Sequence, residues 1–291
     1  MTWSAKQYSA FENERTRPVR DLVAALPNEQ VGHAVDLGCG PGNSTEVLAA
    51  RYPQADVTGM DSSDDMVQAA RKRLPSIAFE LADIETWNPP RRYDVILANA
   101  ALQWVPDHAT LYPRLVGKLA PGGSLAVQTP DNLEEPAHKL ARQVAADGPW
   151  AGKIGGVKHP PRHSAAWYYE LLKPHCGRLD VWRTTYMHPL ADAQAVVEWF
   201  KGTALRPYLN KLDANEQAAF LARYHDEIAR AYPALADGTV LLPFPRLFLV
   251  AAPQLTRCAA RRVPRVPVQT EPTPCRRNSA PASAPASCGT W

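Results

Sequence analysis

The chain has few features that would take it outside the ordinary globular class. Its 291 residues include no run of about 18 apolar side chains, so no membrane-spanning helix is predicted. The first residues, Met1 to Lys6, lack the apolar stretch of a signal peptide. Neither sign of charge dominates, since 32 Lys and Arg against 29 Asp and Glu leave a net charge of +3. This balance gives no reason to expect nucleic acid or a membrane as a partner.

Cysteine is scarce, and its spacing is not that of a disulfide framework or a zinc site. The chain has 5 cysteines, of which Cys39 stands in a glycine-rich segment and Cys176 stands alone. We therefore expect reduced thiols and a cytoplasmic protein. The histidines show no metal-ligand spacing either, because His159 and His163 flank prolines and do not share a helix face. No metal site is predicted.

The most informative segment runs from residue 34 to residue 45. A short apolar run ends in Asp36, and three glycines follow at alternate positions. These glycines are Gly38, Gly40 and Gly42. A helix is predicted to open at Asn43 or Ser44, both favourable N-cap residues. A strand, a glycine turn and a helix start form the part of an α/β sheet where nucleotides bind.

The spacing of these glycines separates two classes of cofactor. The dinucleotide fingerprint needs Gly-x-Gly-x-x-Gly or Ala, and its last position falls on Asn43 or Thr45, depending on the starting glycine. An acid before Gly-x-Gly-x-Gly is instead typical of methyltransferases that use S-adenosylmethionine (SAM), a sulfonium compound without phosphate. The sequence therefore favours SAM over NAD, although a protein that binds SAM without turnover would carry the same turn.

Predicted strands and helices alternate over residues 30–132. The strands are expected at 34–37, 56–60, 77–81, 93–98 and 123–128, and the helices at 43–51, 64–73 and 107–118. This alternation predicts a doubly wound, Rossmann-like α/β sheet that forms the SAM-binding core. Residues 1–29 are expected to form an N-terminal helical cap, broken near Arg17 and Pro18.

The pattern changes after residue 132. Residues 133–235 are predicted to form a mainly helical lid with acceptor-binding elements and one sheet strand near 181–187, and residues 236–252 the final strand. The helices of this predicted lid are expected at 133–147, 165–173, 192–200 and 213–231, with a long loop at 148–163. In this loop Lys158, His159, Arg162 and His163 are expected to form a solvated basic segment. Residues 253–291, dominated by Pro, Arg, Ala and Ser, are predicted to be a disordered tail.

Residues at the ends of the predicted strands are candidates for the SAM site. Asp61 follows the second strand, where an acid accepts hydrogen bonds from ribose hydroxyls, although it could simply cap the next helix. Asp83 follows the third strand and is expected to meet the adenine amine, with Ile84 against the ring. Asn99 and Ala100 follow the fourth strand, near the methionine part of SAM. The other candidates are Asp36, Gly38, Gly40, Gly42, Asn43, Ser62 and Met66.

Three further residues are predicted to position the reacting groups, and none of them is a general base. They are Gln103, Trp104 and Asn132. An aromatic face near a sulfonium is favourable by about 0.5–2 kcal/mol, which suits Trp104. A core tryptophan that packs against the helix at 107–118 is an equally good interpretation of this residue.

The whole pattern resembles the trans-aconitate methyltransferase family, a group of class I small-molecule methyltransferases. The resemblance extends from about Trp3 to Ala252, and the residues after Pro253 have no counterpart in it. The segments that carry it are Glu14–Pro18, Asp36–Thr45, Gly59–Ser63, Ala98–Ala100, Gln103–His108, Ala126–Asn132, Gly202–Tyr208 and Phe244–Phe248. The family usually has Gly where Ala204 stands.

The resemblance implies transfer of the SAM methyl group to a carboxylate of trans-aconitate, giving a monomethyl ester. A carboxylate is already ionised at pH 7, so no catalytic His or Cys is needed. The carboxylates that do not react need cations, and the arginine fork suits them. The predicted substrate-binding residues are Tyr8, Arg17, Arg183, Tyr186, Arg206 and Arg246. A SAM-dependent methyltransferase with another small acceptor is the alternative, and the sequence does not fix the oligomeric state.

Overall fold

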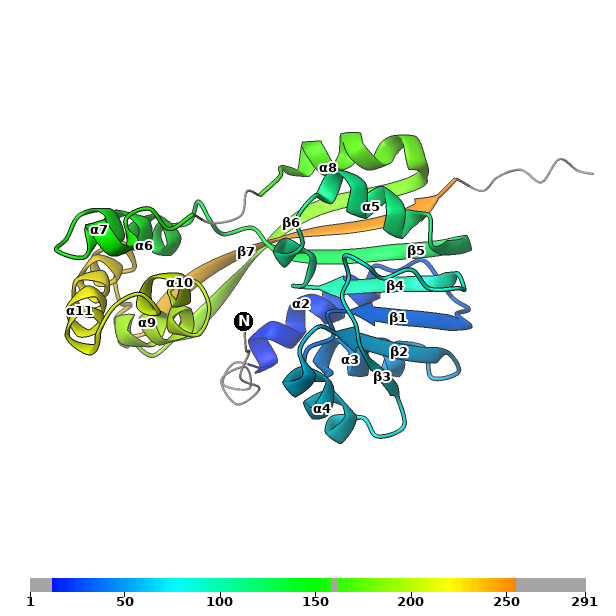
Figure 1. The fold of residues 1–291 in the computed structure, drawn as a ribbon, viewed down its shortest axis with the longest axis horizontal. Coiled ribbons are helices and arrows are strands. Elements are labelled where there is room, and N and C mark those ends of the chain that lie inside the picture. Colours follow the sequence, from blue (N-terminus) through cyan, green and yellow to red (C-terminus); the bar gives the residue numbers. More distant parts are fainter. Residues whose placement is uncertain (1–11, 159–161, 255–291) are drawn as a thin grey trace, which may run out of the picture. The chain divides into compact units, whose positions relative to one another are not determined.

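The computed structural model describes residues 12–158 and 162–254. Figure 1 shows them as a central sheet with helices packed on it and a further group of helices around the extended ends of two strands. The predicted substrate residue Tyr8 lies outside the described residues. Of the predicted tail, residues 255–291 also lie outside the described residues. Pro253 and Gln254 are described, and Pro253 ends the last strand.

Seven strands form one mixed sheet in the order β3-β2-β1-β4-β5-β7-β6. The strands are β1 (His33–Leu37), β2 (Asp56–Asp61), β3 (Ala78–Leu81), β4 (Tyr93–Asn99), β5 (Leu119–Pro130), β6 (Cys176–Leu190) and β7 (Val240–Pro253). The first five strands pair in parallel, and β7 runs antiparallel to both β5 and β6. The predicted doubly wound α/β fold is confirmed. Its strand order reverses between β1 and β4, the point where such sheets bind ligands.

The helices that cover the two faces of the sheet belong to separate hydrophobic clusters. One cluster joins α2 (Glu12–Ala24) and α3 (Asn43–Arg51) to β1, β4 and β7. The other joins α5 (His108–Val116) and α8 (Ala165–Leu172) to β4, β5 and β7 on the opposite face. A fifth helix, α4 (Asp64–Arg73), packs beside β2 and β3. With both faces covered, the central strands β1 and β4 are almost entirely buried, as is usual in parallel sheets.

Pro18 does not break the first helix, contrary to the prediction. It lies inside α2, where its ring removes one backbone hydrogen bond. The flanking residues Val19, Leu22 and Val23 are at most 3% exposed and pack on the sheet. Because helix stability in a folded protein comes mainly from such packing, the helix continues through the proline.

A third hydrophobic cluster, which we call the lid cluster, lies around the far ends of β6 and β7 (Figure 1). Its helices are α6 (Pro136–Ala146), α7 (Ala151–Ile154), α9 (Ala193–Lys201), α10 (Arg206–Leu209) and α11 (Ala214–Ala231). The short helices α7 and α10 were not predicted. Helix α8 falls between these helices in sequence, but its residues Tyr168 and Leu172 belong to the cluster that packs α5 on the sheet. The lid cluster therefore excludes part of the predicted 133–235 segment.

The strands β6 and β7 connect the lid cluster to the sheet. They pair continuously from Leu190 beside Val240 to Cys176 beside Pro253, apart from one irregularity near Cys176. Strand β6 extends beyond the predicted 181–187 at both ends because it pairs with β7 from Cys176 to Leu190, and its last residue, Leu190, belongs to the lid cluster. The two short 3₁₀ segments are η2 (Leu102–Trp104) and η3 (Lys173–His175).

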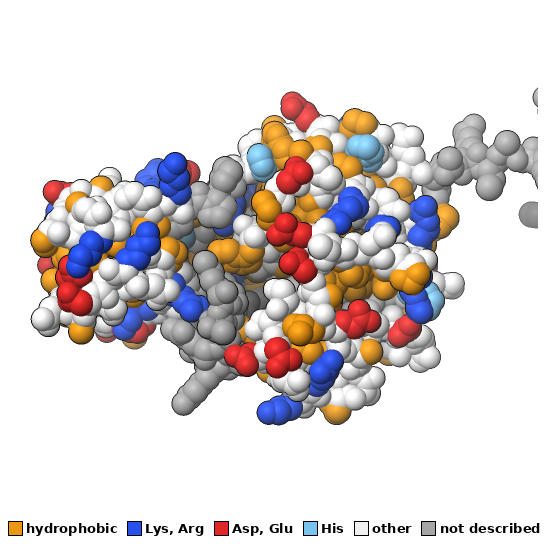
Figure 2. Space-filling view, in the orientation of Figure 1, with side chains coloured by type: hydrophobic (Ala, Val, Ile, Leu, Met, Phe, Trp, Pro, Cys, Tyr) orange, Lys and Arg blue, Asp and Glu red, His pale blue; other side chains and the backbone are white. Residues whose placement is uncertain are grey.

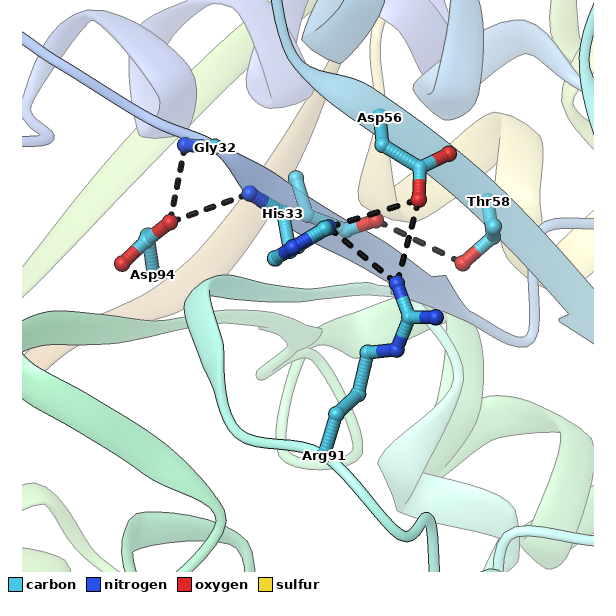
Figure 3. A network of polar contacts seen from close by, with 7 residues as sticks. Gly32, His33, Asp56, Thr58, Arg91 and Asp94 are labelled. Carbon is cyan, nitrogen blue, oxygen red and sulfur yellow. Dashed lines mark hydrogen bonds and ion pairs between the residues drawn. The ribbon is translucent and has the colours of Figure 1, made fainter.

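A polar network holds together the amino ends of β1, β2 and β4 (Figure 3). Asp94 accepts backbone hydrogen bonds from Gly32 and His33 at 2.8 and 3.0 Å. Arg91 donates to the Asp56 carboxylate at 3.2 Å, and His33 lies 3.3 Å from the same oxygen. This network is at the edge of the sheet opposite the carboxyl ends of the strands, so it aligns the strands and is remote from the candidate site.

Candidate active site

The glycine turn after β1 needs glycine for two physical reasons. Gly38, Gly40 and Gly42 all have positive φ, at 68°, 56° and 94°. A Cβ on Gly38 would also lie 2.5 Å from the Ala101 Cβ atom, which is too close. The N-cap of α3 is Gly42, not the predicted Asn43 or Ser44. The hydroxyl groups of Ser44 and Thr45, in the first turn of α3, point back toward Asp36 in β1.

Asp36 lies behind this turn, fully buried. Its Oδ2 accepts hydrogen bonds from the hydroxyls of Ser44 and Thr45 at 2.6 and 2.7 Å. Burial raises the pKa of Asp36 to about 6. The carboxylate thus joins β1 to the first turn of α3 and shapes the loop, and it is not part of the cavity wall.

A cavity of about 370 Å³ opens at the carboxyl ends of β1, β2, β3 and β4. Nine of the predicted SAM-binding residues line it. They are Gly38, Gly40, Asp61, Ser62, Met66, Asp83, Ile84, Asn99 and Ala100. The other three, Asp36, Gly42 and Asn43, lie outside its wall.

The two acids in the cavity wall are held by backbone hydrogen bonds. Asp61 accepts from the N–H of Gly40 through one oxygen and from the N–H of Ser63 through the other, both at 2.9 Å. Asp83 accepts from the N–H of Glu85 at 2.8 Å. A carboxylate has about four acceptor positions, so Asp61 retains capacity for two ligand hydroxyls after fixing the glycine turn.

The segment after β4, which lines the cavity, has an unusual backbone conformation. Ala100 has a φ of 52°, a left-handed conformation that costs free energy in a residue with a Cβ. Its N–H donates to Gln128 O at 2.8 Å, and its carbonyl accepts from Gln103 Nε2 at 2.7 Å. The neighbouring Asn99 Oδ1 is buried without a hydrogen-bond partner among the described residues.

Trp104 is not a core residue. Its side chain is 53% exposed and forms part of the cavity wall beside Gln103, which is buried. Of the two sequence interpretations, the packing role in the core is therefore excluded.

Behind Gln103 and Trp104 lies a buried hydrogen-bonded pair. His108 contacts Leu102 O through Nε2 at 2.8 Å and the Tyr168 hydroxyl through Nδ1 at 2.6 Å. The carbonyl can only accept, so Nε2 carries the proton and Nδ1 accepts from Tyr168. Burial lowers the pKa of His108, which favours this neutral form. His108, the first residue of α5, thus joins that helix to η2 and to α8.

The end of the cavity away from Asp61 is built from the β5–α6 connection, β7 and the lid cluster. Its wall includes Asn132, Phe244 and Arg246, of which Asn132 and Arg246 were predicted. Arg246 is 4% exposed and donates to Gln128 Oε1 at 3.0 Å. Its guanidinium carbon lies 4.8 Å from the centre of the Phe244 ring. A buried cation thus stands beside an aromatic ring in the cavity wall.

The other predicted substrate residues that the structure describes lie outside the cavity wall. Arg183 is paired with Asp131 at 2.8 Å and with Glu135 at 3.5 Å. Arg17 stacks on the Tyr186 ring at 5.3 Å, and the Tyr186 hydroxyl donates to Asp21 at 2.6 Å. Arg206 begins the short helix α10 and does not line the cavity.

Arg162 and His138 are two of the twelve cavity residues that were not among the predicted site residues. Arg162, assigned to a solvated basic loop, lines the cavity and donates to Gln103 O at 3.2 Å. His138 of α6 also lines it and packs edge-on against Phe200. No sequence pattern could have found Arg162, because it follows two prolines in an irregular segment and its partner is 59 residues away.

The structure also bears on metal sites, membrane-spanning helices, thiols and surface charge, for the residues that it describes. Within 12–158 and 162–254, no group of three or more His, Cys, Asp or Glu residues is arranged to hold a metal ion. In the same ranges, no helix is both long and apolar enough to cross a membrane. Cys39 and Cys176 are buried free thiols. Acidic and basic side chains are interspersed over the face shown in Figure 2.

The residues at the carboxyl ends of β1 to β4 fit a molecule such as SAM. A Cβ on Gly40 would meet nothing within 4 Å, so the backbone there is open to close approach by a ligand. Asp61 and Asp83 offer acceptors for hydroxyl and amine groups, and Met66 and Ile84 offer apolar surface for a ring. The unpartnered Asn99 Oδ1 offers an acceptor for an ammonium group.

Comparisons with known proteins agree with this geometry. Residues 34–123 match the family described as "Methyltransferase domain". The chain is 54% identical over 253 residues to a trans-aconitate 2-methyltransferase of Methylobacterium radiotolerans, covering 86% of this chain and 97% of that protein. It is 52% identical over 257 residues to a trans-aconitate 2-methyltransferase of Rhizobium meliloti, covering 88% and 100%.

A solved structure shares the fold at much lower sequence similarity. The YcgJ protein from Bacillus subtilis superposes with a TM-score of 0.54 at 13% identity, covering 82% of this chain and 99% of that protein. At this identity the likeness concerns the fold alone.

Proposed function

This chain belongs to the trans-aconitate 2-methyltransferase family, and we propose that it uses SAM to esterify a carboxylate of trans-aconitate to a monomethyl ester. One observation carries the proposal beyond family membership. A single cavity has acidic residues at the switch point of the sheet and the buried cation Arg246 at its other end. The acidic residues can accept hydrogen bonds from the hydroxyl and amine groups of SAM, and the cation can bind a carboxylate of the acceptor.

On this proposal, the SAM end of the cavity is formed by the glycine turn and the acids after it. Asp61 would accept hydrogen bonds from the ribose hydroxyls, and Asp83 from the adenine amine. Ile84 and Met66 would pack on the ring, and Gly38 and Gly40 would let the ligand approach the backbone closely. Asn99 and Ala100 would meet the amino-acid end of SAM.

The chemistry needs positioning more than proton transfer. When bound, SAM supplies a methyl group whose carbon a carboxylate oxygen attacks, forming the C–O bond as the C–S bond breaks and its electron pair stays on sulfur. The attacking carboxylate has no proton to lose at pH 7, so no residue of the chain is needed as a base. Gln103, Trp104 and Asn132 line the junction of the two ends and would orient the acceptor. Orientation can supply about 7–11 kcal/mol in favourable systems.

Arg246 would hold a carboxylate that does not react. Its burial among aromatic side chains lowers the local dielectric, which strengthens its attraction to an anion. The lid cluster would exclude water from the reacting carboxylate. We also propose that the enzyme acts in the cytoplasm, because its buried thiols are unpaired and SAM is made inside cells.

The competing function is methylation of a different small acceptor, such as a phenol or a ring carbon. Incubation with methyl-labelled SAM and a panel of organic acids and phenols separates the two. A carboxylate ester loses its label in mild base, whereas an aryl ether or a C-methyl product keeps it. Base-labile label with trans-aconitate as the best acceptor supports the proposal. Base-stable label, or preference for a phenol, would overturn it.

A further inference from the structure

Arg162 is a partly buried cation that has no counter-ion among the residues that the structure describes. Its Nη1 donates to Gln103 O at 3.2 Å. Within the described residues its Nε is buried and has no hydrogen-bond partner, and no carboxylate oxygen lies within 4.0 Å of its guanidinium group. A guanidinium has five N–H donors, so most of the hydrogen-bonding capacity of Arg162 is unused.

Such an arrangement is costly unless something else compensates the charge. Removing a cation from water is unfavourable by several kcal/mol without a partner. Several exposed arginines elsewhere have carboxylate partners, as Arg183 has Asp131 and Arg230 has Glu227. The guanidinium of Arg162, which has no carboxylate partner among the described residues, instead lines the cavity. An anionic ligand in that cavity would supply the missing charge.

The position of Arg162 puts it at the acceptor end of the cavity. It lies within electrostatic range of Asp131, in the segment that leads from β5 to Asn132. Arg246 is paired in register with Pro130, at the end of the same strand. Two cations therefore flank residues 130–132, while the predicted SAM residues lie on β1 to β4 and the turns after them.

We propose that Arg162 binds a carboxylate of the acceptor that is not methylated and, with Arg246, gives the enzyme its preference for polycarboxylates. The inference rests on the proposed function and deepens it. Two cations at one end of the cavity match a substrate with two carboxylates beyond the one that reacts, that is, a tricarboxylate. Because Arg162 is hydrogen-bonded to the Gln103 carbonyl, binding there also fixes the acceptor relative to the residues around the reacting methyl group.

The test compares Arg162→Gln and Arg162→Lys with the native protein. Arg162→Gln should lower kcat/KM for trans-aconitate by roughly 10- to 150-fold, the loss expected of one charge-assisted hydrogen bond. Arg162→Lys should recover only part of it, because an ammonium cannot make a two-pronged contact. A monocarboxylate should be a poor substrate for all three proteins and should change less than threefold. Arg230→Gln, in an exposed pair on α11, is the matched control and should behave as native.

A carboxylate is also present in the amino-acid part of SAM, so SAM affinity is measured by calorimetry in parallel. The proposal expects it to change less than threefold in Arg162→Gln. A tenfold or greater loss would assign Arg162 to SAM and overturn the proposal. An equal loss for trans-aconitate and the monocarboxylate would also overturn it, because Arg162 would then only support Gln103. Arg162→Lys keeps the charge and serves as the test if Arg162→Gln melts at a much lower temperature.

Failure of the proposed function can be told apart from failure of this inference. If the native protein methylates no carboxylic acid, the proposed reaction is wrong. Binding of trans-aconitate is then measured calorimetrically in the presence of S-adenosylhomocysteine. Binding to the native protein that weakens at least tenfold in Arg162→Gln would still support an anion site at Arg162. Equal binding by both proteins, or none by the native protein, would contradict it.

Discussion

Asp36 is a buried carboxyl group whose ionisation opposes folding. Its pKa is raised from 3.8 to about 6, chiefly by burial and against the two hydroxyl donors of Ser44 and Thr45. Between these two pKa values the folded protein holds a proton that the unfolded chain has released. Stability is therefore greatest below about pH 4 for this group, and it decreases as the pH rises toward 6.

Replacing Asp36 with Asn should remove this pH dependence. The amide oxygen can still accept from both hydroxyls, and it carries no charge to desolvate. Relative to the variant, the native protein should lose on the order of 3 kcal/mol of unfolding free energy between pH 4 and pH 7. Urea denaturation of both proteins across this range measures the difference. Parallel curves for the two proteins would show that Asp36 does not titrate in this range.

Asp61 is the residue on which the SAM assignment depends most. Replacement by Ala removes the acceptors for the ribose hydroxyls, each charge-assisted hydrogen bond being worth about 1.5–3 kcal/mol. SAM affinity, measured by calorimetry, should fall at least tenfold. Asp65→Ala, an exposed acid in the first turn of α4, is the control and should bind SAM as the native protein does. Unchanged affinity in a folded Asp61→Ala protein would contradict the assignment.

At the level of elements, the contact between α8 and α5 is specific and testable. Tyr168→Phe removes the hydroxyl that donates to His108 Nδ1 and leaves that buried nitrogen without its donor. The expected loss is about 1–3 kcal/mol of unfolding free energy, measured by urea denaturation at pH 8, where the imidazole is neutral. Tyr169→Phe changes the neighbouring, exposed ring in the same way and should cost less than about 0.5 kcal/mol. Equal losses would show that the His108 contact contributes nothing particular.

The elements themselves could be predicted from the sequence to the extent that local patterns determine them. Helix α3 begins and ends where predicted, at residues 43 and 51, because the glycine turn and the apolar spacing are both local signals. The continuation of α2 through Pro18 could not be predicted, since it depends on the packing of Val19 and Leu22 against the sheet. Helices α7 and α10 each span four residues, too few for a periodic pattern.

The candidate site also has one part that local sequence patterns predicted and another that they did not. Residues at strand ends, such as Asp61 and Asn99, were found because the carboxyl ends of parallel strands meet at one edge. The acceptor end draws on segments far apart in sequence, and there arginine alone is a weak signal. Of the four predicted arginines, only Arg246 lines the cavity, while Arg183 pairs with surface acids. Arg162 became visible only through its tertiary contact with Gln103.

At the scale of the whole described structure, the cavity joins two separately packed parts. Its SAM end rests on strands that belong to the sheet clusters, and its acceptor end includes Trp199, Phe200 and Phe244 of the lid cluster. The lid cluster has its own buried residues, including Phe220 and Tyr224, both fully buried. This separation implies that damage inside the lid cluster should affect acceptor use before it affects SAM binding.

Phe220→Ala tests that implication directly. Phe220 packs against the rings of Trp150 and Tyr208, with centroids 5.5 and 5.9 Å away, and does not line the cavity. Its truncation should cost about 3–5 kcal/mol locally. Amide hydrogen exchange should accelerate in α9 and α11 while β1 and β4 remain protected. KM for trans-aconitate should rise by more than tenfold, and SAM affinity should stay within threefold. Phe220→Leu, which leaves a smaller cavity, should shift each quantity in the same direction by less. Equal acceleration of exchange in the sheet and the lid cluster, with a proportional loss of SAM affinity, would contradict this expectation. The two parts would then unfold as one cooperative unit, and the separation of their clusters would have no functional consequence.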